Sequence, residues 1–173
     1  SEMCIRDRVL TPDQLNTEQA LLDFTTKQEA LTYLHSLQLM ALLSYPVAAY
    51  TAPQFSADDL NQLAAHIKKP GIFLTDLFQM ILERLSLKPL NVIWIETSRI
   101  TEWGFYLAFY PQGIGVIEQL NEITRNAYQC LCKGNHEAFA KNLADSYRLI
   151  LSSVQAYMVE KYKFTEALSV KVP

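Results

Sequence analysis

Two long runs of apolar residues at helical spacing lie on either side of Gly134, and they constrain the fold more than any other feature of the sequence. The first run covers residues 116–131 and the second covers residues 139–157. Apolar residues spaced by three and four are typical of one face of an α-helix. Gly134 is suited to the left-handed conformation that ends a helix, and Asn135 is suited to cap the next one. This pattern predicts a long antiparallel helical hairpin.

The preceding sequence also carries helix signals. Thr26 and Glu29 form a capping-box pattern, so we expect a helix to begin there and to end near Pro46, because a proline disfavours helical geometry at Tyr45 before it. Ser56 is expected to cap a second helix that ends near residue 69. Further helices are expected over residues 73–87, 91–95 and 100–110. The β-branched residues of 91–95 could also form a strand, but a lone strand would have nothing to pair with, so a short helix is expected there. The fold class predicted from these patterns is an all-α bundle of about six or seven helices that ends in the hairpin.

The first eight residues, SEMCIRDR, do not read as the start of a domain. Reverse translation matches most of them to the end of a common sequencing adapter, so we interpret residues 1–8 as translated adapter and not as native sequence. Residues 9–173 are then expected to form a single all-α domain. A reading frame that runs into an adapter is also expected to have lost the beginning of a longer protein.

The composition indicates a folded chain and argues against two classes of partner. Hydrophobic residues make up 50% of the sequence and charged residues 19%, which argues against disorder. A formal net charge of −3 argues against a nucleic-acid partner, which would require a basic face. The longest apolar stretch, LQLMALLSYPVAAY, is interrupted by Gln38, Ser44 and Pro46. It is therefore expected to be a buried core helix and not a membrane span.

The cysteines and histidines do not form a metal-binding pattern. Cys130 and Cys132 are two residues apart, which places their side chains on nearly opposite sides of a helix. His35, His66 and His136 are far apart in the sequence, and His35 reads as a core residue within an apolar helix. No metal ligands are predicted, and the cytoplasm is the expected location.

Two arginines are the candidate substrate-binding residues. Arg84 follows an apolar helical run, and Arg99 precedes the aromatic segment. A guanidinium at the edge of a packed core can bind a carboxylate through two parallel hydrogen bonds. The alternative for both is an ion pair with Glu83, Glu96 or Glu102.

Aromatic residues are concentrated between residues 94 and 110. Core packing or a subunit interface explains them more simply than a ligand pocket, although a pocket stays open as an alternative. The aromatic side chains are Trp94, Trp103, Phe105, Tyr106, Phe109 and Tyr110.

The last hairpin, VIEQLNEITRNAYQCLCKGNHEAFAKNL, resembles the end of prephenate dehydrogenases, with Gly134-Asn135 at the turn and Phe139 shortly after it. Upstream, LTYLHSL at residues 31–37 is similar to the first long helix of that family's C-terminal domain. Met80-Ile81 followed by Arg84 is similar to the segment that carries a substrate-binding arginine. Where the family usually has a His-Asp pair, this chain has Lys27-Gln28.

The resemblance implies a function for the chain as part of a longer enzyme. In the family, an N-terminal domain binds NAD or NADP and carries the principal catalytic histidine, and a helical C-terminal domain forms the homodimer and supplies an arginine to the substrate. The implied reaction is the NAD(P)-dependent oxidative decarboxylation of prephenate or arogenate in tyrosine biosynthesis. Arg84, or failing that Arg99, would bind the small carboxylate substrate, and this chain alone would be inactive and would bind neither cofactor nor metal.

Two other functions are kept as alternatives. The chain could be a stand-alone helical interaction module without catalysis, or a helical binder of a small molecule or lipid that uses the aromatic segment. The interaction module predicts a natural start codon close to Val9 and no carboxylate ligand, whereas the small-molecule binder requires an enclosed apolar pocket lined by residues 94–110.

Overall fold

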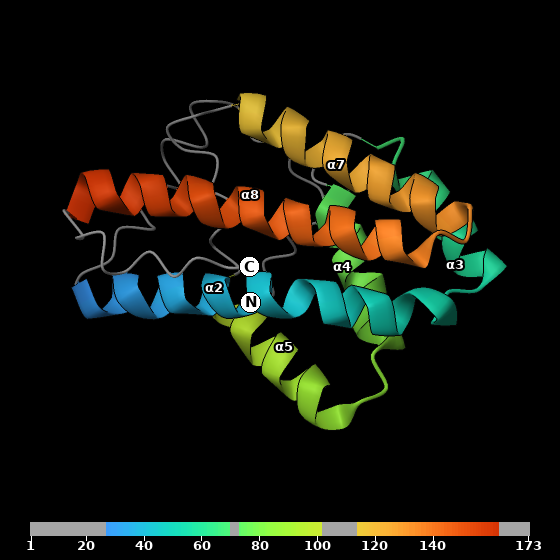
Figure 1. Cartoon of the computed structure of the whole chain (residues 1–173), viewed down its shortest axis with the longest axis horizontal. Helices are drawn as coiled ribbons and strands as arrows, with labels where there is room; N and C mark the ends of the chain where they lie inside the picture. The colour runs from blue at the N-terminus through green and yellow to red at the C-terminus, as the bar shows by residue number, and fades with distance from the viewer. Residues whose placement is uncertain (1–26, 70–72, 102–113, 163–173) are drawn as a thin grey trace.

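The computed structural model describes residues 27–69, 73–101 and 114–162, and all regular structure within these ranges is helical (Figure 1). The elements in chain order are α2 (Lys27–Thr51), the short 3₁₀ helix η2 (Ala52–Gln54), α3 (Ala57–His66), α4 (Phe73–Arg84), α5 (Lys88–Thr101), α7 (Ile114–Cys132) and α8 (His136–Tyr162). The predicted all-α bundle is therefore confirmed. The capping box expected at residues 26–29 and the aromatic residues from 103 to 110 lie outside the described side chains.

The helical hairpin forms where the sequence predicts it. Gly134 has φ +70°, and its amide donates to the Leu131 carbonyl at 3.0 Å. The amide of Asn135 donates to the Cys130 carbonyl at 2.9 Å, which completes a Schellman motif at the end of α7. The Asn135 side chain then accepts a hydrogen bond from the Ala138 amide at 3.1 Å and caps α8. These local bonds turn the chain within two residues, so α7 and α8 pack as antiparallel neighbours (Figure 1).

The first described helix does not end at Pro46, contrary to the prediction. α2 continues through the proline to Thr51, although Pro46 has no amide to donate to the Leu42 carbonyl. A proline inside a helix costs about 3 kcal/mol. The residues beyond it offset this cost, because Val47 and Ala48 are fully buried and burial of a valine side chain alone is worth about 1.5–3 kcal/mol. Tertiary packing therefore overrides the local signal.

The short helices are joined by side-chain caps. α3 begins at the predicted cap, Ser56, and ends at His66, three residues before the expected boundary at residue 69. α4 ends at Arg84, earlier than expected, because Asn91 of α5 donates to the carbonyls of Leu82 and Leu85 at 3.2 Å each. The segment that could have been a strand is part of α5, as the helical prediction for residues 91–95 requires.

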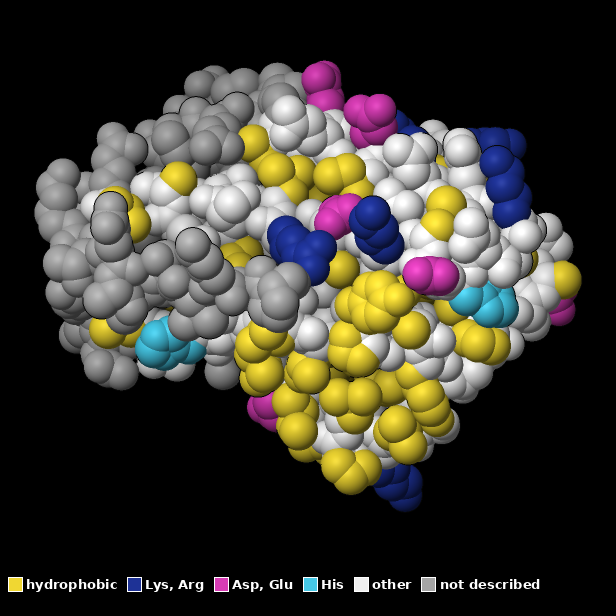
Figure 2. All heavy atoms as spheres, viewed as in Figure 1, with side chains coloured by type: hydrophobic (Ala, Val, Ile, Leu, Met, Phe, Trp, Pro, Cys, Tyr) yellow, Lys and Arg dark blue, Asp and Glu magenta, His cyan; other side chains and the backbone are white. Residues whose placement is uncertain are grey.

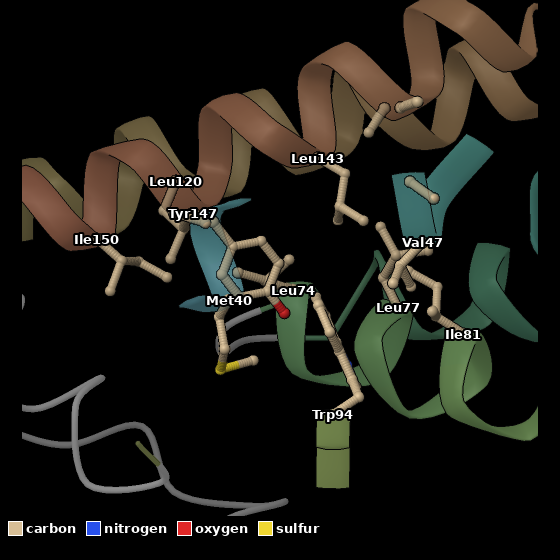
Figure 3. Close-up of a cluster of buried hydrophobic side chains, with 14 of the residues drawn as sticks. Met40, Val47, Leu74, Leu77, Ile81, Trp94, Leu120, Leu143, Tyr147 and Ile150 are labelled. Atoms are coloured by element: carbon tan, nitrogen blue, oxygen red, sulfur yellow. The ribbon is translucent and has the colours of Figure 1, made fainter. Parts of the chain in front are cut away.

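α8 lies at the centre of the bundle, between α2 and α7 (Figure 1). α3 and α4 pack at one end, and α5 lies against α2 on the side away from α7. Side chains from five helices meet in the core, including Val47, Leu77, Trp94, Leu120 and Leu143, all of which are fully buried (Figure 3). This arrangement covers one side of α2 with α8 and part of another side with α5.

Candidate functional site

Arg84, the first candidate substrate-binding residue, forms a bidentate ion pair with Asp59. Arg84 is the last residue of α4, and its Nε donates to Asp59 Oδ2 at 3.0 Å while its Nη2 donates to Oδ1. Asp59 is held in place by a capping box, because its Oδ2 also accepts the Ser56 amide at 2.8 Å and its own amide donates to Ser56 Oγ at 3.2 Å. The pair therefore joins the start of α3 to the end of α4.

The environment of this pair favours the charged carboxylate. The hydrogen bonds from Arg84, together with those from Ser56, lower the pKa of Asp59 to about 2 despite its burial. The Asp59 side chain is 3% exposed, whereas that of Arg84 is 36% exposed. A substrate carboxylate would have to displace a preorganised protein carboxylate from the same guanidinium. The pairing was foreseen as an alternative to substrate binding, but the partner is Asp59 and not one of the glutamates considered.

Arg99, the second candidate, lies on the exposed side of α5. Its Nη1 donates to Glu96 Oε1 at 3.4 Å, and the two side chains are 71% and 59% exposed. An ion pair this exposed contributes little to stability. The contact agrees with the ion-pair alternative, but the guanidinium stays accessible to solvent. Arg84 and Arg99 lie on different helices and have different carboxylate partners.

The histidines and cysteines are dispersed over the fold. His35 lies on the exposed side of α2, so the prediction that it is a core residue is wrong. The apolar pattern of residues 30–42 does not show which side of α2 packs inward. His66 at the end of α3 contacts Asp76 of α4, with 3.1 Å between Nδ1 and Oδ1. Cys130 and Cys132 are free thiols. Within the described ranges, no three histidine, cysteine or acidic side chains are grouped closely enough to hold a metal ion.

Trp94 is a core residue, as the packing interpretation of the aromatic segment predicts. Its ring stacks on Phe78 with 5.7 Å between centroids. It also meets Tyr147 edge to face, with 5.8 Å between centroids, and Figure 3 shows these two side chains in the core. The indole is fully buried, and its Nε1 has no hydrogen-bond partner among the described residues. Trp94 therefore anchors α5 to α4 and α8 through its apolar ring.

Large apolar side chains are exposed on α2, on α5 and in the turn before α5. We refer to this set as the α2–α5 apolar surface, and Figure 2 shows apolar atoms gathered over α5 and the adjoining part of the bundle. A hydrogen bond of 2.9 Å between Tyr50 Oη and Ser86 Oγ connects its two halves. The surface consists of Leu39, Leu42, Tyr45 and Tyr50 of α2, Leu87 of the turn, and Val92 and Ile93 of α5.

Sequence reasoning missed this surface for an identifiable reason. Residues 92–95 are four consecutive apolar residues, and consecutive residues point to different sides of a helix. Packing uses only Trp94 as a fully buried anchor, so Val92 and Ile93 are left exposed by 58% and 46%. The apolar stretch of α2 likewise predicts a buried core helix, yet Leu39 and Leu42 face outward. The sequence does carry one signal of this surface: each of the two segments has more apolar residues than one face of a helix can hold.

None of the helices in the described ranges is both long enough and apolar enough to cross a lipid bilayer. Comparison with family models, curated proteins and solved structures finds no match to this chain.

Proposed function

We propose that this chain is a self-associating helical domain that forms a homodimer through the α2–α5 apolar surface. The observation that carries the proposal is the exposure of Leu87, Val92 and Ile93, which are 45%, 58% and 46% exposed on adjoining turns. Single exposed apolar residues are ordinary on protein surfaces, whereas a group of them marks an interaction site. Among the large apolar side chains that are exposed in the described ranges, Val159 of α8 alone lies outside this surface.

The charge pattern supports the same function. Residues 36–57 contain no acidic or basic side chain, and this range includes the exposed α2 residues Leu39, Leu42, Tyr45 and Tyr50. Depletion of charge and enrichment of aromatic residues are typical of the centre of a protein interface. A surface that had only to stay solvated would carry charges at these positions.

The size of a stable interface explains why both helices are needed. Specific interfaces bury on the order of 800 Å² on each partner. α5 has 14 residues and is therefore only about 21 Å long, so its exposed face alone is too small. The neighbouring α2 residues supply the additional apolar area.

We further propose that this helical domain is part of a prephenate dehydrogenase-like enzyme. The hairpin that resembles prephenate dehydrogenases has its glycine turn, its Asn135 cap and a fully buried Phe139. A helical homodimerisation domain would then serve an oxidoreductase whose NAD or NADP site lies in another domain, in a reducing cytoplasm suited to the free thiols of Cys130 and Cys132. In that context Arg99 is the better substrate-binding candidate, because Arg84 is held by Asp59.

Calorimetric titration with prephenate tests the substrate part of this context separately. Binding by the unmodified chain that is lost in Arg99→Gln and retained in Arg84→Gln supports it. Absence of any binding removes the substrate role of the chain and leaves the association function in place.

Light scattering over a concentration series tests the association. The unmodified chain is expected to approach the mass of a dimer, and Ile93→Asp is expected to weaken the dimer by at least about tenfold, because a charge would be buried in an apolar contact. Val159→Asp is the matched control: Val159 is 50% exposed but lies on α8, so this variant should dimerise normally. A mass that stays monomeric at every concentration would remove the proposed function.

A further inference from the structure

The exposed side of α5 carries an ordered pattern of charge. Lys88, Val92 and Glu96 follow one another at intervals of four residues, so they lie along one side of the helix. All three are exposed, with a base at one end, an acid at the other and the 58% exposed valine midway between them. When a second copy of this helix lies antiparallel to the first, the base of each copy therefore faces the acid of the other, and the two valines face each other.

We infer that the partner of this surface is a second copy of the chain, with the two α5 helices crossing antiparallel about a two-fold axis at Val92. The inference rests on the proposed homodimer and adds its register. A two-fold axis brings the same patch of each subunit together, so Val92 meets Val92 of the partner subunit. Lys88 of each copy then faces Glu96 of the other, which gives two equivalent ion pairs on either side of an apolar centre.

The charges favour this antiparallel crossing over a parallel pairing of the two α5 helices. A parallel pairing of α5 helices would place Lys88 against its own symmetry equivalent and Glu96 against its own, so like charges would meet at both ends. Like charges across an interface suppress a wrong register, and complementary charges favour the correct one. Only the antiparallel crossing pairs each base with an acid.

The contact already made by Glu96 is compatible with the pairing. Arg99 approaches only Oε1, at 3.4 Å, and the Glu96 side chain is 59% exposed. The carboxylate can therefore accept Lys88 of the other copy while it keeps its contact with Arg99. Val92 and Ile93 supply the apolar contact, and the charged pairs set its register.

Disulfide trapping tests the position of the axis. Cys4, Cys130 and Cys132 are first replaced by serine, and Val92→Cys is then introduced into the full chain. Side chains at the axis lie close enough for a disulfide, so mild oxidation should convert most of this variant to a covalent dimer on a non-reducing gel. Ser152→Cys in the same background is the control, because Ser152 is exposed on α8, away from the predicted contact.

Charge exchange tests the pairing. Lys88→Glu and Glu96→Lys are each expected to raise the dissociation constant of the dimer by on the order of tenfold, because each places two like-charged pairs across the axis. The double variant Lys88→Glu/Glu96→Lys restores opposite charges and should dimerise within about threefold of the unmodified chain.

The outcomes separate this inference from the proposed function. Efficient trapping at position 92 together with rescue by the double variant supports the antiparallel crossing. A stable dimer that is not trapped at position 92 and shows no charge rescue overturns the crossing but leaves the association function intact. A monomer at all concentrations overturns both the crossing and the proposed association.

Discussion

Asp59 and Arg84 connect α3 to α4 through two hydrogen bonds between one carboxylate and one guanidinium, across 25 residues of sequence. The same carboxylate accepts the Ser56 amide, so a single side chain begins one helix and holds the end of another. This relationship makes Asp59 a structural residue, and it accounts for the position of Arg84 without a substrate.

The pH dependence of the free energy of unfolding should show that the Asp59 carboxylate is stabilised in its charged form by Arg84. Its pKa in the folded chain is about 2, below the ordinary value of about 3.9 for an aspartate. A lowered pKa stabilises the folded state above the ordinary value, and this contribution is lost as the pH falls from about 4 towards about 2. Urea unfolding from pH 7 to pH 2 should show this loss in the unmodified chain, and a smaller loss in Asp59→Asn.

Asp58→Asn is the control for this experiment. Asp58 is adjacent to Asp59 but exposed, so its replacement should leave most of the acid-dependent loss in place. Equal acid dependence of Asp59→Asn and the unmodified chain would show that the ion pair does not hold the carboxylate in solution.

Replacement of Gly134 should destabilise the hairpin through backbone strain. Its φ of +70° disfavours residues with a Cβ, whereas the position of a Cβ is sterically open, because no atom outside Gly134 and its two chain neighbours lies within 4 Å of it. Gly134→Ala should therefore lower the free energy of unfolding by about 1–2 kcal/mol. Gly134→Asn should lower it less, because asparagine tolerates this conformation better. Chemical denaturation measures both, and equal stabilities for alanine and glycine would contradict the turn.

Trp94 should tolerate replacement by phenylalanine better than by alanine. Trp94→Ala removes a fully buried ring and should lower the free energy of unfolding by about 3–5 kcal/mol. Trp94→Phe keeps a ring against Phe78 and Tyr147 and also removes an indole N–H that has no partner in the described structure. A buried unpaired polar group costs about 1–3 kcal/mol, so its removal offsets part of the lost packing. Urea unfolding that finds the two variants equally unstable would contradict this role of the ring.

The predictable parts of the fold are those that local residues determine. The turn at Gly134 and the caps at Ser56 and Asn135 depend on side chains within a few residues of each helix end, and all three occur as predicted. The continuation of α2 past Pro46 depends on burial of Val47 against distant helices.

The surroundings of the candidate site residues depend on contacts between helices that the sequence does not specify. The pairing of Arg84 with Asp59 requires α3 and α4 to lie side by side, which no local pattern reveals. The exposure of Val92 and Ile93 depends on which side of α5 packs inward, and consecutive apolar residues left that choice open. The helical elements were therefore more predictable than the surface they form.

Sedimentation equilibrium of the unmodified chain and of Val92→Asp/Ile93→Asp measures whether the chain associates through this surface. We expect the mass of the unmodified chain to rise with concentration towards twice the monomer mass of 19.8 kDa, and the variant to stay at the monomer mass with its helical circular dichroism unchanged. An unmodified chain that remains monomeric throughout, or a variant that dimerises as tightly as the unmodified chain, would contradict association through the α2–α5 apolar surface.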